Sequence, residues 1–170
     1  MNTLHANISS SFGHEKRPPP ADLVVPDGFD QFEKEDAVAF YEGKTWQDVH
    51  AHLQGLKNAV AGAAYFLEEW SVLNPAYLAY YLRAHLEYLF ETLASNTPDT
   101  EFILHLLGEL QQVIHMHKSN PFTSTQTALL KQLAQYVCDH TAKNNLSAYQ
   151  EQDIEQYANQ LLVGLEAYGS

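Results

Sequence analysis

Apolar side chains recur at helical spacing along most of this chain, and no stretch shows the alternation that is typical of a strand. Near the N-terminus, Leu4, Ile8 and Phe12 recur every four residues and predict a short amphipathic helix. A further helical turn or two is predicted over residues 33–41. Longer apolar stripes predict helices that begin near Thr45, Asn74, Pro98, Thr123 and Ser147.

This pattern predicts an all-α fold, an irregular bundle of about five or six helices. The segment 14–36 differs from the rest, because its prolines lack an amide donor and fix φ, which favours an extended arm with a turn. We therefore expect residues 1–36 to form a short helix and an extended arm, and residues 37–170 to form a single helical domain. Gly55 and Gly62 predict a break in the helix that begins near Thr45.

Several helix starts are marked by capping residues. Asn74 followed by Pro75 is a typical start. Proline fits the first helical position, because an N–H group there would have no hydrogen-bond partner within the helix. Three further starts carry a hydroxyl side chain followed three residues later by an acid or an amide, which is the spacing of a capping box: Thr45 with Asp48, Thr123 with Gln126, and Ser147 with Gln150.

The helix predicted over residues 74–93 is apolar around most of its circumference, and only Arg83, Glu87 and Glu91 form a polar strip. We expect this helix to be central. Its tyrosines (Tyr77, Tyr80, Tyr81 and Tyr88) are typical core residues, although an aromatic patch beside an arginine is also typical of protein-binding hot spots.

The net charge limits the kinds of partner that the protein is expected to bind. The net charge is −12, from 21 acids against 9 bases, and a chain so poor in Lys and Arg is unsuited to phosphate backbones and anionic lipid surfaces. Cys138 is the single cysteine, which favours a reducing compartment, and no apolar run approaches the ~20 residues of a membrane span. We expect a cytoplasmic protein that binds neither nucleic acid nor membranes.

Three short patterns carry a resemblance to a known family. They are Phe40-x-x-Gly43-Lys44-x-Trp46, Asn74-Pro75-x-Tyr77-x-x-Tyr80-Tyr81-Leu82-x-Ala84, and Pro121-Phe122-Thr123-x-x-Gln126. Over residues 37–140 the chain resembles a family of small bacterial helical proteins of unknown function. The resemblance implies a bacterial cytoplasmic protein and supplies no activity. Arg83 stands where that family often has proline, so we expect the central helix of this chain to be straighter.

The first functional hypothesis is a non-enzymatic interaction protein, of the immunity, antitoxin or regulatory adaptor kind. Common nucleophile, zinc-protease, phosphate-loop and dinucleotide motifs are all missing, which argues against an enzyme of those classes. No Lys or Arg follows Lys143, so the last helix presents a purely acidic outer face that suits a basic partner protein. The expected contact residues are Tyr80, Arg83, Glu87, Glu151, Asp153 and Glu155. An exposed apolar stripe would also allow a homodimer, and no cofactor is expected.

The alternative hypothesis is a small-ligand or metal-binding protein. Glu101, His105 and Glu109 are spaced four apart and share one helix face, which would suit a divalent ion if a second helix supplied further ligands. That face lies opposite the apolar stripe and is typical of a solvated surface. A ligand pocket would instead use His85 with Tyr81 and Tyr88, although a buried neutral histidine bonded to a tyrosine or a carbonyl explains the same pattern.

Overall fold

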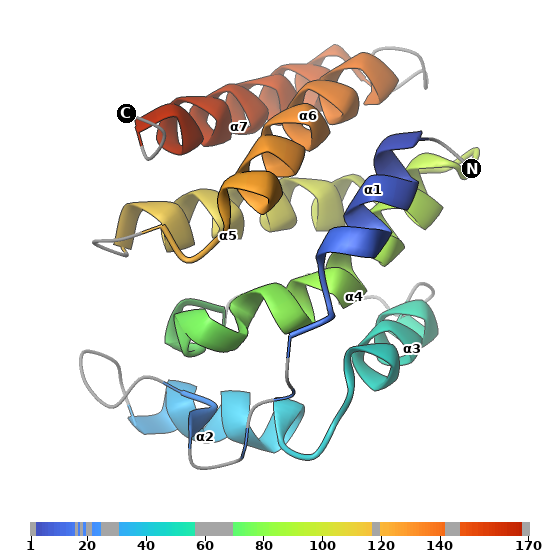
Figure 1. Cartoon of the computed structure of the whole chain (residues 1–170). Coiled ribbons are helices and arrows are strands. Elements are labelled where there is room, and N and C mark those ends of the chain that lie inside the picture. Colours follow the sequence, from blue (N-terminus) through green and yellow to red (C-terminus); the bar gives the residue numbers. More distant parts are fainter. Residues whose placement is uncertain are drawn as a thin grey trace.

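The fold is all-helical in the part of the chain that the structure describes. The computed structural model describes residues 3–15, 17, 19, 22–24, 31–56, 70–116, 120–141 and 147–167. Within these ranges there are seven α-helices, one short 3-10 turn and no strand (Figure 1). The α-helices are α1 (Thr3–Ser11), α2 (Gln31–Tyr41), α3 (Trp46–Leu56), α4 (Pro75–Leu93), α5 (Thr100–Met116), α6 (Ser124–Thr141) and α7 (Ala148–Ala167), and the 3-10 turn η3 is Trp70–Val72.

The all-α prediction is confirmed, whereas the count of five or six helices is too low. The difference lies at the N-terminal end, where α1 and α2 are both short but complete helices. Helix α2 also runs across the boundary expected between residues 36 and 37. Most of the proline-rich arm, and the break expected near Gly62, lie outside the described residues.

The capping residues predicted at the helix starts make the expected hydrogen bonds. At the start of α4 the Asn74 side chain accepts the Ala76 amide, and Pro75 is the first helical residue. All three capping boxes are reciprocal: in each, the first side chain accepts the amide three residues later, and the fourth side chain accepts the amide of the first residue. The pairs are Thr45 with Asp48, Thr123 with Gln126, and Ser147 with Gln150. These starts are therefore set by local sequence.

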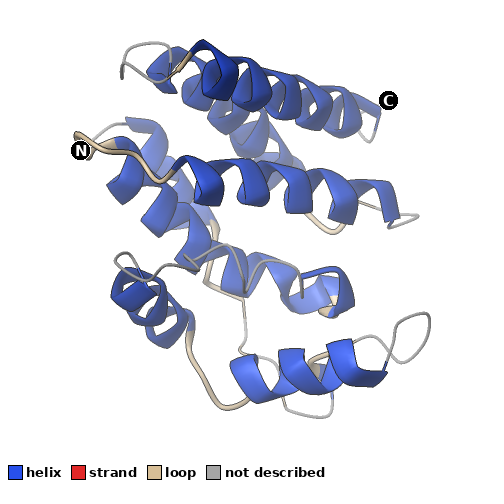
Figure 2. Cartoon of the chain, turned by 180° about the vertical axis from the view of Figure 1, so that it is seen from behind, coloured by secondary structure: helices blue, strands red, loops and turns tan. Residues whose placement is uncertain are grey.

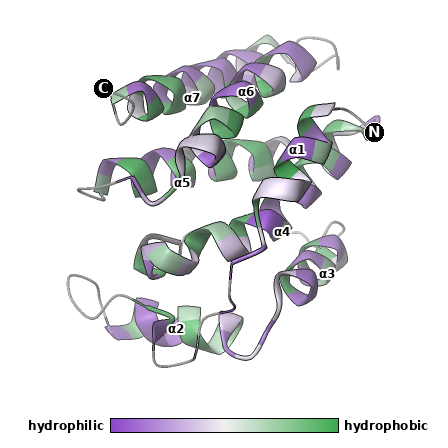
Figure 3. Ribbon diagram, viewed as in Figure 1, coloured by the Kyte–Doolittle hydropathy of each residue, from purple (hydrophilic) through white to green (hydrophobic). Residues whose placement is uncertain are grey.

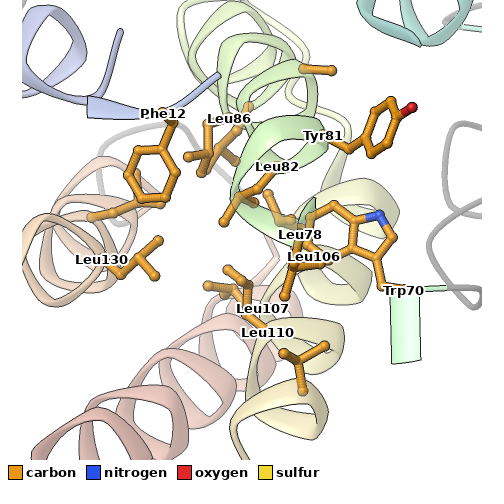
Figure 4. Packing of buried hydrophobic residues seen from close by; sticks show 14 of the residues in the cluster. Phe12, Trp70, Leu78, Tyr81, Leu82, Leu86, Leu106, Leu107, Leu110 and Leu130 are labelled. Carbon is orange, nitrogen blue, oxygen red and sulfur yellow. The ribbon is translucent and has the colours of Figure 1, made fainter. Parts of the chain in front are cut away.

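Helix α4 is the central element, as its composition predicts, and it runs unbroken from Pro75 to Leu93. It lies between α2 and α3 on one side and α5, α6 and α7 on the other (Figure 1). Leu82 and Leu86 of α4 face Phe12 and Leu130, while Tyr81 lies toward Trp70 on the other side of the helix (Figure 4). All these side chains belong to one buried cluster, so the helices share a single hydrophobic core.

Helix α1 packs across α4 and α6, two helices that are far from it in the sequence. Ile8 and Phe12 are fully buried in the shared core. The chain then turns at Gly13, whose φ of 76° lies in the left-handed region that favours glycine. A Cβ at this position would also lie 2.8 Å from Arg83 Cγ, so glycine is needed both for the turn and for the close approach of α4.

None of the described helices combines the length and the apolar character that a membrane crossing requires.

Candidate functional site

Helices α5 and α7 lie side by side (Figure 1 and Figure 2), and the sequence colours of Figure 1 show that they run in the same direction. Three pairs fix their register. Gln150 Nε2 near the start of α7 donates to Thr100 Oγ1 at the start of α5, over 3.1 Å. Tyr157 lies against Gly108, and Gly164 lies against Ile114. Successive turns of the two helices therefore face one another along their whole length.

Two glycines allow this close packing. A Cβ on Gly108 would lie 3.3 Å from Tyr157 Cε1, and one on Gly164 would lie 3.2 Å from Ile114 Cγ2. Both distances are tighter than ordinary van der Waals contact, so a larger residue at either position would displace its neighbour. The absence of a side chain at Gly108 lets the Tyr157 ring lie directly against α5.

Two hollows open along this pairing of helices. The first has a volume of ≈ 450 Å³ and combines acidic, amide and aromatic groups. Its walls are Leu104, His105, Gly108, Glu109 and Gln112 from α5, and Asp153 and Tyr157 from α7. The second, of ≈ 550 Å³, has no acid or base other than a histidine among the described residues that line it. Its walls are Gln111, Ile114 and His115 from α5, and Asn159, Gln160, Val163, Gly164 and Ala167 from α7.

The hollows follow one another along one groove, which we call the α5–α7 seam. On α5, the lining positions 104, 108, 111 and 115 are separated by four, three and four residues. On α7, positions 153, 157, 160 and 164 have the same spacing. Residues three or four apart share one face of a helix, so each set forms a continuous stripe.

The two helices of the seam carry charge of one sign. Six carboxylates lie on α5 and α7 (Glu101, Glu109, Glu151, Asp153, Glu155 and Glu166), and neither helix has a Lys or Arg. Within the seam itself, Glu109 on α5 and Asp153 on α7 line the same hollow. Glu155 lies two residues beyond Asp153 and so on another side of α7, which leaves it outside the seam.

Exposed apolar side chains gather on the same pair of helices. In the described part of the chain, five large hydrophobic residues are exposed, and four of them belong to α5 or α7: Met116 (44%), Tyr149 (74%), Tyr157 (38%) and Val163 (68%). Tyr149 lies four residues before Asp153 and extends the stripe toward the start of α7. Polar and apolar residues accordingly alternate along α7 (Figure 3).

The predicted contact residues divide between two places. Asp153 lies in the seam, and Glu151 and Glu155 lie elsewhere on α7. Arg83 and Glu87 are instead engaged inside the molecule, where they hold α1. Arg83 donates to the carbonyls of Ser9 and Phe12 and to Glu87 Oε1.

The aromatic neighbours of Arg83 are also part of the interior. Its guanidinium lies 4.5 Å from the ring centre of Trp46. Tyr80, also predicted as a contact residue, is buried. The Tyr80 and Arg83 side chains therefore contribute to the packing of α4 and do not extend the exposed face of α5 and α7.

The residues of the predicted ligand pocket are packed against other side chains. His85, Tyr81 and Tyr88 are all buried. The His85 ring meets Trp70 edge to face at 4.4 Å, and its Nδ1 lies 3.1 Å from the Tyr81 carbonyl. Burial raises the pKa of both tyrosines to about 12, so both hydroxyls stay neutral at physiological pH.

The predicted metal face is only partly assembled around the first hollow. His105 and Glu109 line it and are joined by Asp153, whereas Glu101 is not among its walls. In the described ranges no three His, Cys, Asp or Glu side chains come close enough together to hold a metal ion. The structure thus gives no geometric support to a metal centre at this face.

Sequence reasoning missed the parts of the seam that depend on pairing. Gly108 and Gly164 each interrupt an otherwise good helical sequence, and an isolated helical glycine is a signal of close packing. The exposure of Tyr149 and Tyr157 could not be read from sequence alone, because it depends on which helix covers which face.

No protein-family model, curated protein or solved structure matches this chain. The geometry and the charge of the seam are therefore the features from which a function can be inferred.

Proposed function

We propose that this protein is a non-enzymatic interaction module, of the immunity, antitoxin or regulatory adaptor kind, and that the α5–α7 seam docks a basic partner protein. One observation carries the proposal: among the described residues, the helices that expose most of the large apolar side chains are also the helices that carry acids and no Lys or Arg. Apolar contact and charge can then act on the same partner.

The two features have different roles in binding. Burying Tyr149, Tyr157 and Val163 would provide apolar contact area, and tyrosine is enriched among the residues that dominate binding energy. The negative field would attract a basic surface and raise the rate of association, particularly at low ionic strength. A bacterial cytoplasmic setting, suggested by the family resemblance and the single cysteine, belongs to the same proposal.

The charge also disfavours self-association through this face. Two copies meeting seam to seam would place two pairs of helices that carry acids and no Lys or Arg against one another. Like charges placed together across an interface cost free energy, so the proposed partner is a different protein.

A pair of matched variants tests the proposal. The seam variant replaces Glu109→Gln and Asp153→Asn, which line the first hollow, and the control variant replaces Glu151→Gln and Glu155→Gln, which lie outside it. Both remove two negative charges from the pair of helices that forms the seam. Tagged proteins are incubated with a lysate of the source cells at moderate salt, and the bound proteins are quantified by mass spectrometry.

We expect the wild type and the control variant to retain the same basic protein in near-equal amount, and the seam variant to lose most of it. With the purified pair, the association rate of the seam variant should fall by about tenfold or more at low ionic strength and by less at high salt. Recovery of the chain alone, or equal retention by both variants, would contradict docking at the seam.

A further inference from the structure

We propose that the first hollow of the seam is a socket for one arginine side chain of the partner, and that the second hollow accepts an apolar side chain of the same partner helix. This inference rests on the proposed function and specifies the chemistry that the partner must present. It is carried by the walls of the two hollows and by their separation.

The first hollow has the groups that recognise a guanidinium. Glu109 on α5 and Asp153 on α7 place a carboxylate on each of its two helices, and Tyr157 supplies an aromatic ring. A guanidinium is planar, donates in pairs to carboxylates and stacks on aromatic rings, whereas an ammonium is a compact point charge. This combination therefore favours arginine over lysine.

Gly108 sets the position of the aromatic wall. Because the residue has no side chain, the Tyr157 ring can lie against the α5 backbone, beside Leu104 and within the same hollow as both carboxylates. The methylene groups of an arginine would contact the ring and Leu104 while its guanidinium reached the acids. Long basic side chains commonly pack their methylene groups on apolar surface while their charged end lies among polar groups.

The second hollow has a different character. Ile114 lies buried at its base, Val163 and Ala167 add apolar surface, and its other walls are amides, a glycine and His115. None of the described residues that line it carries a carboxylate. Burying a leucine or similar side chain there would be favourable, because its apolar surface would leave water.

The separation of the hollows selects the spacing on the partner. Along α5 and α7, the lining positions of the second hollow lie about six to eight residues beyond those of the first, which corresponds to about 10 Å at the helical rise. Residues seven apart on a helix are separated by about 10 Å and share one face. A partner helix lying along the seam would thus present an arginine and an apolar residue seven positions apart.

A second copy of this chain offers no helix that could supply the arginine. The chain has two arginines, Arg17 and Arg83. Arg83 is half-buried and holds α1, and Arg17 lies outside the described helices, where it donates to the Gly43 carbonyl. The occupant is accordingly a segment of another protein.

The test titrates synthetic stapled helical peptides into the full chain at low salt. Binding is measured from the shifts of the protein's amide NMR signals. The first peptide carries one arginine and one leucine seven positions apart. A second replaces the arginine by lysine, and a third keeps both residues but places them five positions apart, on different faces. We expect saturable shifts at Gly108, Tyr157 and Gly164 with the first peptide, and dissociation constants about tenfold weaker with the other two.

Two protein variants accompany the peptides. Asp153→Asn should lower the affinity for the arginine peptide by about tenfold. Glu155→Gln removes the same charge from the same helix but outside the seam, and should change that affinity by less than about twofold. The amide spectrum of each variant shows whether its fold is intact.

Several results would overturn the socket. Equal binding of the arginine and lysine peptides, or equal weakening by the two variants, would indicate diffuse charge attraction. No saturable peptide binding at all would remove the inference outright. Free arginine or spermidine binding as tightly as the peptide would instead make the hollow a small-molecule site. In the first two cases the lysate experiment can still succeed, so failure of the socket is distinguishable from failure of the proposed function.

Discussion

Replacing Arg83 by glutamine is expected to lower the free energy of unfolding by about 3 kcal/mol and to weaken the attachment of α1. The guanidinium donates to the Ser9 and Phe12 carbonyls at the end of α1 and to Glu87 on its own helix. Glutamine cannot span these acceptors, and it leaves the half-buried Glu87 carboxylate without its basic neighbour on α4. Urea unfolding gives the loss of stability, and hydrogen exchange of the α1 amides shows where it occurs.

The chain provides its own control for this substitution. Arg17, the other arginine, is exposed and donates to one carbonyl among the described residues, so Arg17→Gln should cost less than about 0.5 kcal/mol. A second comparison uses Arg83→Gln with Glu87→Gln, because removing both charges avoids an uncompensated buried carboxylate. The double variant should therefore lose less stability than the sum of the single variants. Additive losses, or an Arg83→Gln variant as stable as the wild type, would show that the pair does not hold α1.

The attachment of α1 explains why two residues predicted to meet a partner are found inside the molecule. An arginine beside tyrosines on a helix suggested a binding hot spot, but here it contacts the N-terminal helix. Glu87 also accepts bonds from His5 and Ser9, both on α1. The partners lie more than 70 residues away in sequence, and helix periodicity carries no information about contacts at that separation.

Features that depend on neighbouring residues could be predicted from sequence. The capping boxes at Thr45, Thr123 and Ser147 formed as expected, because each bond joins residues three apart. The central position of α4 also followed from its composition, since a helix that is apolar around most of its circumference must be covered on several sides. Local bonds and burial are both encoded over short stretches of chain.

The seam could be predicted only in part, because it depends on which helices pair. The spacing of His105 and Glu109 correctly placed them on one face of α5, but nothing in that spacing indicated that Asp153 would share their hollow. The pairing requires Gly108 and Gly164 to lie opposite bulky residues of the other helix. A hydrophobic stripe identifies the buried face of a helix and leaves its neighbour undetermined.

His85 provides the second large effect, because its protonation state is fixed by its surroundings. The Tyr81 carbonyl can only accept a hydrogen bond, so Nδ1 carries the proton and donates to it. Nε2 then remains an unprotonated acceptor, buried beside the Trp70 ring. Burial lowers the pKa of His85 to about 3, and the bond to Tyr81 offsets only part of that shift.

This shift makes the protein sensitive to mild acid. Because the pKa of His85 is about 3 in the folded state and near 6.5 when unfolded, the neutral ring stabilises the fold fully above pH 6.5, and that stability is lost as pH falls from 6.5 toward 3. Between pH 7 and pH 5 the loss should be about 2 kcal/mol. Urea unfolding at the two pH values measures it.

The variant His85→Gln removes the titrating group while keeping an amide that can donate to the Tyr81 carbonyl. Its stability at pH 7 will be lower, but its decline between pH 7 and pH 5 should be smaller than that of the wild type by about 2 kcal/mol. The stability of His105→Gln, at an exposed histidine of α5, should decline as that of the wild type does.

The pKa of Glu87 is lowered, because bonds from His5 and Ser9 and the Arg83 charge outweigh its burial. Its contribution is therefore lost only at more acidic pH. Burial also lowers the pKa of His52, so it is the difference between the wild type and His85→Gln, rather than the decline of the wild type itself, that reports on His85. If His85→Gln and the wild type decline equally between pH 7 and pH 5, the buried neutral histidine is not the source of the acid sensitivity.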